Sequence, residues 1–395
     1  MKHINKTILF FISFFLLFFI SSCTSVQPGN EFPVPSPDSF NTPDFRDKHW
    51  QNNEGFSIAV IPDSQAYVNY AAQTTSPKPY VIDQWKIYYR QTEFIARNSV
   101  QNGGDFSFAL HVGDHVEHSA KYSSEWELAA KCFENLNGQI PVLTVPGNHD
   151  YDKFSRFTHQ SSGSQNFNKY FGPDSVFFKD KSWYKGSFAD GKNSYAIFDA
   201  CGRQFLVIGL EVNPDDNAIR WAQSVLDENK TLPAIILTHA YLHYKREKSG
   251  KNATGNFKYT NARYRRKESD WTPQKLWNNF VSKNNQIFLV ICGHEGTPEQ
   301  GSAYRIDTNK NGYTTYTILS DFQFFYEYLK DHNIQGPKKP LFCGDGWFSI
   351  VDIDLLNNKI ELSCFNCETG KTLKGDPFEM TFPINWDWNE RLGLH

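Results

Sequence analysis

Five short apolar runs of this chain each end at residues that can bind a metal ion, and this pattern constrains the fold more than any other feature. The runs span residues 56–62, 106–112, 140–145, 234–238 and 286–292. Their length and nearly continuous apolar character are typical of buried strands. Close behind the successive runs stand Asp63 and Gln65, Asp114, Asn148 and His149, His239, and His294.

Helical patterns separate the first three runs. Residues 80–100 carry apolar residues at helical spacing, and Ser124 with Glu127 has the spacing of a capping box that opens a second helix. Strands that alternate with helices predict an α/β sheet, in which ligands bind at the carboxyl ends of the strands. We therefore expect a ligand site at these strand ends.

The most specific strand end is Gly147-Asn148-His149-Asp150. Its Asn oxygen can ligate a metal ion, and the adjacent His can donate a proton. The same four residues could equally form a polar turn whose side chains cap backbone groups. The other four strand ends favour a site, because five metal-competent turns after buried runs would be an unusual set of plain connections. Asp150 itself is expected to serve the turn or to support the ligands.

Taken in order, the strand ends form a series of motifs. They are Asp63-Ser64-Gln65, Gly113-Asp114-His115-Val116-Glu117, Gly147-Asn148-His149-Asp150, Thr238-His239 and Gly293-His294-Glu295-Gly296. The series resembles the calcineurin-like metallophosphoesterases, whose ordered motifs are Asp-x-His, Gly-Asp-x-x-Asp, Gly-Asn-His-Asp/Glu, a lone His after a strand, and Gly-His-x-His. The resemblance covers roughly residues 55–365. It implies a four-layer α/β/β/α sandwich that hydrolyses phosphate esters.

Position by position, the resemblance implies a site for two divalent ions, for which Mn, Fe or Zn are suitable. The implied ligands are Asp63 and Gln65 on one ion, Asn148, His239 and His294 on the other, and Asp114 between them. A hydroxide that bridges the two ions would attack the phosphorus. His149 would act as the general acid, and Glu117 would orient His149.

Two positions depart from the family pattern, and both fall on the same ion. Gln65 stands in place of a His ligand, and Gly296 stands in place of the second His of the last motif. Because Gln offers a neutral oxygen and Gly no side chain, that ion should bind more weakly and favour an oxygen-preferring metal. Equal retention of two ions per chain after dialysis would refute this. Asp321 and Gln323, at the end of a late strand, are expected to support ligands rather than to bind.

Residues 241–271 hold nine basic side chains against three acidic ones, with aromatic residues between them. One interpretation is a solvated surface loop. The other is a lip that steers anionic substrates, because the segment leaves directly from His239. In that case His243, Arg265 and Arg266 would contact the phosphate-ester substrate. The formal net charge of the whole chain is −3, so no specific nucleic-acid partner is predicted.

The first residues are predicted to be an export signal. Two lysines precede the apolar residues 8–20, and Ile20-Ser21-Ser22-Cys23 is similar to a bacterial lipobox. The favoured interpretation is a lipoprotein signal peptide over residues 1–22 and lipidation of Cys23. A plain secretory signal, cut near Ser22 or Ser25, is the alternative.

The remaining boundaries follow from composition. We expect a disordered, proline-rich linker to residue 54, a metallophosphoesterase domain over residues 55–383 and a C-terminal tail over residues 384–395. The lipid would anchor the protein to the membrane of a bacterial cell envelope, which is the outer membrane if the host is Gram-negative. Cys364 and Cys367 are expected to form a local disulfide or to pack as two thiols.

The sequence therefore predicts a metal-dependent phosphoesterase that acts on a phosphate mono- or diester. The alternative is a non-catalytic, metal-containing envelope lipoprotein that binds a glycan or a lipid headgroup. The presence of His149 favours the enzyme, because a binding module has no need of a general acid. Gln65 and Gly296 favour the alternative.

Overall fold

The computed structural model describes most of the chain beyond residue 53. The described residues are Trp50, 54–69, 84–155, 160–247, 256–262, Tyr264, 270–325 and 344–394. The predicted signal peptide, Cys23, all of the predicted linker except Trp50 and Glu54, and the predicted substrate contacts Arg265 and Arg266 lie outside them. Within the described part, no helix has the length and apolar character that crossing a membrane requires.

The first of two large sheets has six strands among the described residues. Their order is β17 (Met380–Pro383), β16 (Lys359–Asn366), β15 (Trp347–Asp354), β1 (Gly55–Ile61), β2 (Phe106–His111) and β3 (Val142–Thr144). The strands β1, β2 and β3 are parallel, whereas β15, β16 and β17 add antiparallel strands on one side. The carboxyl ends of the three parallel strands therefore meet at one edge.

The second sheet has seven strands in the same described part. Their order is β13 (Ser302–Thr308), β14 (Thr314–Ser320), β12 (Ile287–Gly293), β9 (Ala234–Ala240), β8 (Arg203–Leu210), β7 (Asn193–Ala200) and β6 (Tyr184–Phe188). The central strands β14, β12, β9 and β8 are parallel, and the outer ones are antiparallel. All five apolar runs of the sequence are strands of these two sheets, as predicted.

The two sheets pack face to face, and aromatic rings fill much of the space between them. Phe56 of β1 lies 4.7 Å from Phe205 of β8 between ring centroids, and Phe108 of β2 lies 4.5 Å from Phe198 of β7. These rings belong to one buried cluster with apolar residues of both sheets. Burial of so much apolar area is the main force that holds the layers together.

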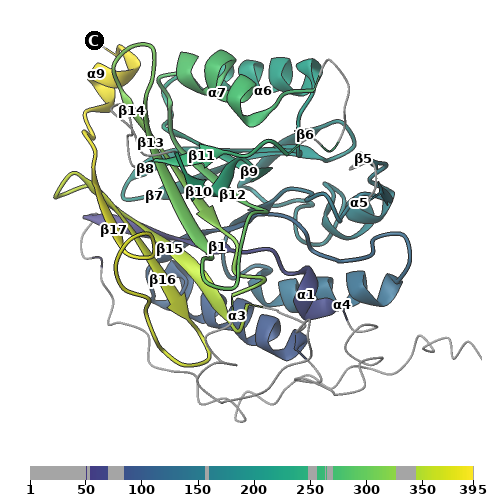
Figure 1. The fold of residues 1–395 in the computed structure, drawn as a ribbon. Coiled ribbons are helices and arrows are strands. Elements are labelled where there is room, and N and C mark those ends of the chain that lie inside the picture. The colour runs from purple at the N-terminus through teal and green to yellow at the C-terminus, as the bar shows by residue number, and fades with distance from the viewer. Residues whose placement is uncertain are drawn as a thin grey trace, which may run out of the picture. The chain divides into compact units, whose positions relative to one another are not determined.

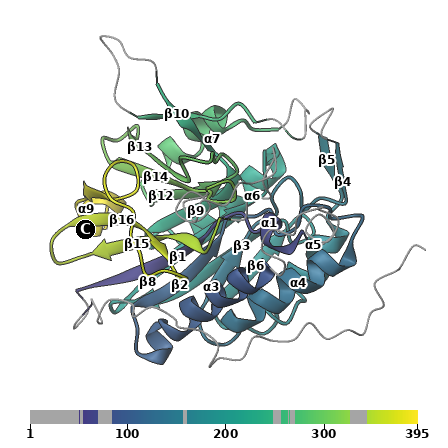
Figure 2. The ribbon, with the colours of Figure 1, turned by 60° about the horizontal axis from the view of Figure 1, so that its bottom comes forward.

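Helices cover the outer face of each sheet. The helices α3 (Trp85–Arg97) and α4 (Ser123–Phe133) lie against the first sheet, and α6 (Asp216–Glu228) and α7 (Pro273–Asn279) lie against the second (Figure 1). Figure 2 shows α3 and α4 side by side on their sheet. This order of layers confirms the predicted four-layer α/β/β/α sandwich.

The start of helix α4 differs from the prediction. No side chain caps its first turn, so Ser124 and Glu127 do not form a capping box. Instead, the fully buried carboxylate of Glu125 accepts hydrogen bonds from the backbone N–H groups of Glu117 (3.0 Å) and His118 (2.8 Å). Helix α4 therefore holds the loop that follows β2.

The folded domain is longer at both ends than the predicted boundaries. Trp50, which was placed in the linker, is buried, and its indole N–H donates to Ser57 at 2.8 Å. The supposed tail contains the short helix α9 (Trp388–Leu392). Trp386 and Trp388 belong to the core between the sheets, and the buried Arg391 donates to three backbone carbonyls. The large aromatic side chains of Trp50, Trp386 and Trp388 explain why these residues pack against the domain.

The segment between residues 151 and 193 contains a helix rather than only a loop. Helix α5 (Gln165–Phe171) buries Phe167 and Phe171, and the ring of Phe171 stacks on His115 at 4.0 Å. The same segment contains the short strand pair β4 (Lys153–Ser155) with β5 (Gln160–Ser162), and a second pair farther along the chain is β10 (Leu242–Arg246) with β11 (Phe257–Tyr259). Among the described cysteines, Cys364 and Cys367 are free, buried thiols.

Candidate metal centre

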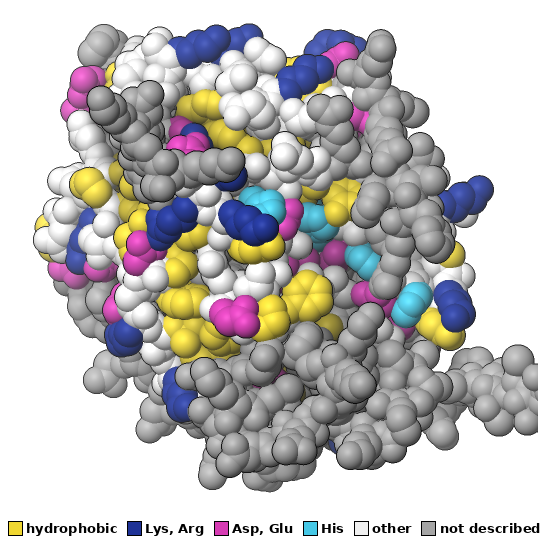
Figure 3. Space-filling model, in the orientation of Figure 1, with side chains coloured by type: hydrophobic (Ala, Val, Ile, Leu, Met, Phe, Trp, Pro, Cys, Tyr) yellow, Lys and Arg dark blue, Asp and Glu magenta, His cyan; other side chains and the backbone are white. Residues whose placement is uncertain are grey.

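The polar strand ends of both sheets come together at one place. Asp114 follows β2, His239 lies in β9, and His294 follows β12. Each of the three residues offers one ligand atom, and these atoms lie within 4.8 Å of one another. On the face shown in Figure 3, histidine and acidic side chains gather in one area. The parallel strands explain the convergence, because each of them ends at the same edge of the sandwich.

His239 is the centre of this cluster. Its Nδ1 lies 2.9 Å from the carbonyl oxygen of Val112 and donates to it, which directs the lone pair of Nε2 toward the cluster. Nε2 lies 3.0 Å from Oδ1 of Asn148, 3.1 Å from Nδ1 of His294 and 3.4 Å from Oδ2 of Asp114. Ligand atoms on one small divalent ion are separated by about 3 Å, so this donor set fits a divalent metal.

Asp114 lies where the two halves of the site meet. Its backbone has a φ of 51°, a strained conformation for a residue with a side chain. Oδ1 accepts the backbone N–H of His149 at 2.8 Å, and Oδ2 accepts the amide of Gln65 at 3.2 Å. Burial by itself would raise the pKa of Asp114, but His239, His149 and His294 outweigh it and hold the pKa below its usual range. The carboxylate is therefore charged and suited to bridge cations.

The second half of the site contains Asp63, Gln65, Asp321 and Gln323, all buried. The amide of Gln323 donates to Oδ2 of Asp321 at 3.2 Å and to Oδ2 of Asp63 at 3.4 Å. Burial raises the pKa of Asp63 well above its usual range, and the charges of Asp321 and Asp114 raise it further. Burial also raises the pKa of Asp321 to about 7. A divalent cation would relieve this repulsion between buried acids.

Asp63, a predicted ligand, and Tyr264, which lies outside the predicted set, hold His294 in place. Like Asp114, His294 has a positive φ, 74°, and its backbone N–H donates to both oxygens of Asp63 at 3.2 Å. Nε2 of His294 is hydrogen-bonded to the hydroxyl of Tyr264, which leaves Nδ1 for the cluster. Tyr264 was not predicted, because nothing in the basic segment 30 residues before His294 signals this contact.

His149 and Glu117 lie together, as the sequence predicted, but the stronger contact is to the main chain. Nδ1 of His149 donates to the backbone carbonyl oxygen of Glu117 at 3.0 Å. The Glu117 carboxylate is farther away, with Oε2 at 3.6 Å from the same nitrogen. The main-chain contact does not depend on the length of the side chain, so Glu in place of Asp leaves the orientation of the ring intact.

Asp150 serves the turn, which is one of the two roles expected for it. Its carboxylate accepts backbone N–H groups from Gly147 at 2.8 Å, His115 at 2.8 Å and Val116 at 3.2 Å. It thereby ties the loop after β3 to the loop after β2. These bonds place the backbone of Gly147 so close to Asp114 that a Cβ at this position would stand 2.1 Å from Oδ1.

The other histidines of the site region support the structure. His111 and His115 are fully buried and stack at 3.9 Å, and burial lowers the pKa of His111 to about 3. His243 on β10 is partly exposed, with Nε2 at 3.8 Å from Oε2 of Glu295, the residue after His294. It therefore borders the cluster, whereas its predicted substrate contact remains a prediction.

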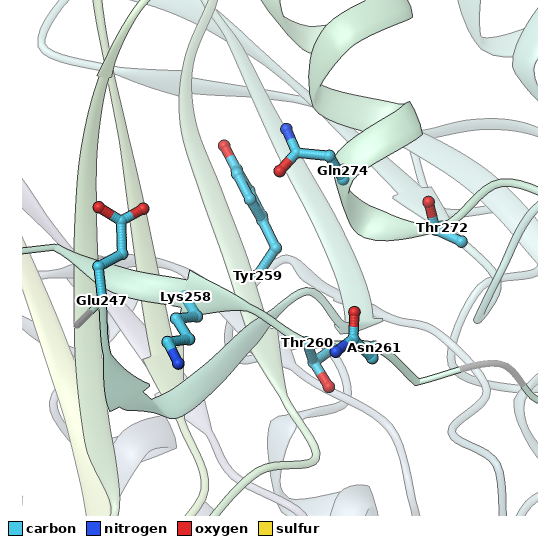
Figure 4. Close-up of a pocket in the computed structure, with 7 residues that line it drawn as sticks. All are labelled: Glu247, Lys258, Tyr259, Thr260, Asn261, Thr272 and Gln274. Atoms are coloured by element: carbon cyan, nitrogen blue, oxygen red, sulfur yellow. The ribbon is translucent and has the colours of Figure 1, made fainter.

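A pocket of about 610 Å³ opens beside the β10–β11 hairpin and the start of α7 (Figure 4). It is lined by Glu247, Lys258, Tyr259, Thr260, Asn261, Thr272 and Gln274. One of these residues reaches toward the metal cluster, since the Thr260 hydroxyl donates to Glu295. The pocket thus adjoins the candidate site along the segment rich in basic and aromatic residues.

A family model described as calcineurin-like phosphoesterase matches residues 56–298, which is more than half of the chain. The chain therefore belongs to the calcineurin-like phosphoesterase family. The matched span contains every predicted metal ligand and both predicted catalytic residues.

Two individual proteins are similar to this chain. The uncharacterized protein YvnB of Bacillus subtilis (strain 168) is 23% identical over 284 residues, which cover 71% of this chain and 18% of YvnB. The crystal structure of a 5'-nucleotidase from Candida albicans SC5314 matches with a TM-score of 0.38 and 10% identity, over 89% of this chain and 55% of that one. The chain thus spans less than a fifth of YvnB and about half of the nucleotidase, and so low a TM-score carries no argument about substrate.

Proposed function

We propose that this protein is a metal-dependent hydrolase of phosphate mono- or diesters and that the cluster around His239 is its active site. The observation that carries the proposal is the environment of His239 Nε2. An amide oxygen, an imidazole nitrogen and a carboxylate oxygen, from Asn148, His294 and Asp114, lie 3.0–3.4 Å from it. Residues from three other strand ends have no structural reason to aim these atoms at one point unless they bind a cation there.

Divalent ions at such a site supply Lewis-acid activation of the phosphoryl group and of the attacking water. The protein itself supplies the proton for the leaving oxygen. His149 is fixed through Nδ1 by the Glu117 carbonyl, so Nε2 on the other side of the ring is the atom that delivers the proton. The carboxylate of Glu117 lies 3.6 Å from the same Nδ1.

Turnover of two model esters tests the proposal. Protein loaded with Mn, Fe or Zn is assayed on p-nitrophenyl phosphate and bis-p-nitrophenyl phosphate, beside Asn148→Ala and His149→Ala. We expect His149→Ala to keep its metal and to lose about 10²–10⁴-fold in kcat, the usual contribution of a general acid. Asn148→Ala should lose metal as well. His118→Gln is the matched control in the same loop, because His118 pairs with Glu125 outside the cluster.

No turnover by the parent with any of the three metals would overturn the proposal. It would favour the alternative of a metal-containing envelope protein that binds a glycan or a lipid headgroup. The ratio of the two rates also assigns the preference for a monoester or a diester.

We further propose that the protein is an exported lipoprotein, anchored to the membrane of a bacterial envelope through Cys23. The support is the basic, apolar and small-residue order of residues 2–23. Metabolic labelling with a radioactive fatty acid in a bacterial host should label the parent and not Cys23→Ala. Equal labelling, or no labelling of either, contradicts the anchor.

A further inference from the structure

Position 296 is closed to the His ligand that the family pattern places there. A Cβ on Gly296 would stand 2.5 Å from the backbone oxygen of Asp321 and 3.0 Å from both Cγ and Oδ2 of its carboxylate. The end of β14 therefore occupies the space into which a side chain at 296 would grow. The atoms found there belong to a carboxylate, which is itself a metal ligand.

The same carboxylate belongs to a network in which two amide side chains donate hydrogen bonds to three buried acids. Nε2 of Gln323 bridges Asp321 and Asp63 at 3.2 and 3.4 Å. Nε2 of Gln65 donates to Asp114 at 3.2 Å. Neutral amides supply only partial positive charge, which is weak compensation for carboxylates taken out of water.

Gln65 gives an independent indication of a ligand. Its side chain is 2% exposed, and its Oε1 has no hydrogen-bond partner. A buried amide oxygen without a partner carries a desolvation cost of about 1–3 kcal/mol. A half-turn of the amide exchanges Oε1 with Nε2 and brings the oxygen to the side of Asp114, where it can bind a cation.

We propose that Asp321 is a metal ligand and that it replaces the missing His of the last motif. With Asp63, Gln65 and Asp114 it forms an all-oxygen site beside the site of Asn148, His239 and His294. Asp321 thus has a direct role instead of the supporting role expected from the sequence. All-oxygen donors select Mn²⁺ or Mg²⁺, whereas two imidazoles suit Zn²⁺ or Fe²⁺. The proposal needs metal binding but no turnover, so it fails or stands separately from the esterase activity.

The substitution Asp321→Asn distinguishes a ligand from a supporting residue. An amide oxygen at this position still accepts the backbone N–H of Gln323, which donates to Asp321 at 3.1 Å. The hydrogen bond from the Gln323 backbone therefore survives in the variant, whereas the bond from the Gln323 side-chain amide to Oδ2 and the charge offered to the ion are lost. Asp352→Asn is the control, because Asp352 is a buried acid on β15 that accepts from Ser57 at 2.6 Å, outside the cluster.

Metal binding is measured on the whole chain by calorimetric titration with Mn²⁺ and by elemental analysis after dialysis. The parent and Asp352→Asn should bind two ions. Asp321→Asn should keep the ion of the histidine site and bind the other more than about 100-fold more weakly, which exceeds the 10–100-fold cost of losing an indirect support of a ligand. Gly296→Ala should weaken the same ion, because its Cβ displaces Asp321. A loss of about 100-fold or less for the second ion in Asp321→Asn, or a parent that binds only one ion at saturation, overturns the proposal.

Discussion

The close approach of Gly147 to Asp114 makes Gly147→Ala a sharp test of the site geometry. The added Cβ would stand 2.1 Å from Oδ1 of Asp114 and 2.3 Å from its backbone nitrogen. Non-bonded carbon and oxygen atoms need more than about 3 Å, so the Asp114 segment must retreat by about 1 Å. Gly147 does not have a positive φ. The substitution therefore acts through this contact and not through backbone strain.

A displacement of about 1 Å in a positioned catalytic group costs about 100-fold in rate. Since Asp114 faces both halves of the site, we expect kcat/KM for the better ester to fall about 100-fold and retention of both ions to weaken together. The folded state should lose about 1–3 kcal/mol, the usual cost of overpacking.

Steady-state kinetics, metal content and thermal denaturation are compared for the parent, Gly147→Ala and Gly186→Ala. Gly186 lies on β6, and the nearest neighbour of its added Cβ would be the ring of Tyr195, at 3.0 Å. This control should keep its metal and its rate. Activity of Gly147→Ala within threefold of the parent, with both ions retained, would refute the reasoning.

Three further results are expected. Burial lowers the pKa of His115 well below its ordinary 6.5, so below pH 6.5 the unfolded chain binds a proton at this position and the folded chain does not. Relative to His115→Phe, the parent should therefore lose about 1.4 kcal/mol of unfolding free energy per pH unit as the pH falls, measured by denaturant titration. Parallel pH profiles of the two proteins would contradict this. Burial lowers the pKa of His239, but the carboxylate of Asp114 raises it, and the net pKa lies above 6.5. Because only the neutral ring binds metal, the metal affinity of the histidine site, measured by calorimetry, should fall as the pH falls through this raised pKa. A metal affinity that stays constant between pH 8 and 6 would exclude the ring as a ligand. Truncation after Pro383 removes the buried Trp386 and Trp388 and should cost several kcal/mol in thermal denaturation, whereas an unchanged Tm would show that this end is a dispensable tail.

Much of the fold could be predicted from the sequence, because the burial of a strand is visible in its local pattern of apolar residues. Runs that are apolar throughout are typical of strands buried on both faces, as in covered parallel sheets. The polar residues directly after them must lie at the carboxyl ends of those strands. Asp114, Asn148, His239 and His294 were found in this way, and the structure brings them together as expected.

Contacts between distant segments left no such local pattern. The burial of Trp50 and Trp386 could not be predicted from the polar, proline-containing segments at the two ends of the domain, because a single aromatic residue does not show which surface it will cover. Likewise, the expected contact of Glu117 with His149 exists, but the main-chain oxygen makes it more closely than the carboxylate. Backbone atoms carry no sequence signature, so only the folded chain could show this.

The sequence by itself determined which residues can bind metal and that they stand at strand ends, because side-chain chemistry and strand periodicity are local properties. Only the tertiary structure decided how the two departures from the family pattern are accommodated. The end of β14 fills the space beside Gly296 with Asp321, and Gln65 joins the same buried network. Gln65 and Gln323, which are hydrogen-bonded in this network, lie 258 positions apart. Their proximity results from the packing of one sheet on the other, which no local pattern encodes.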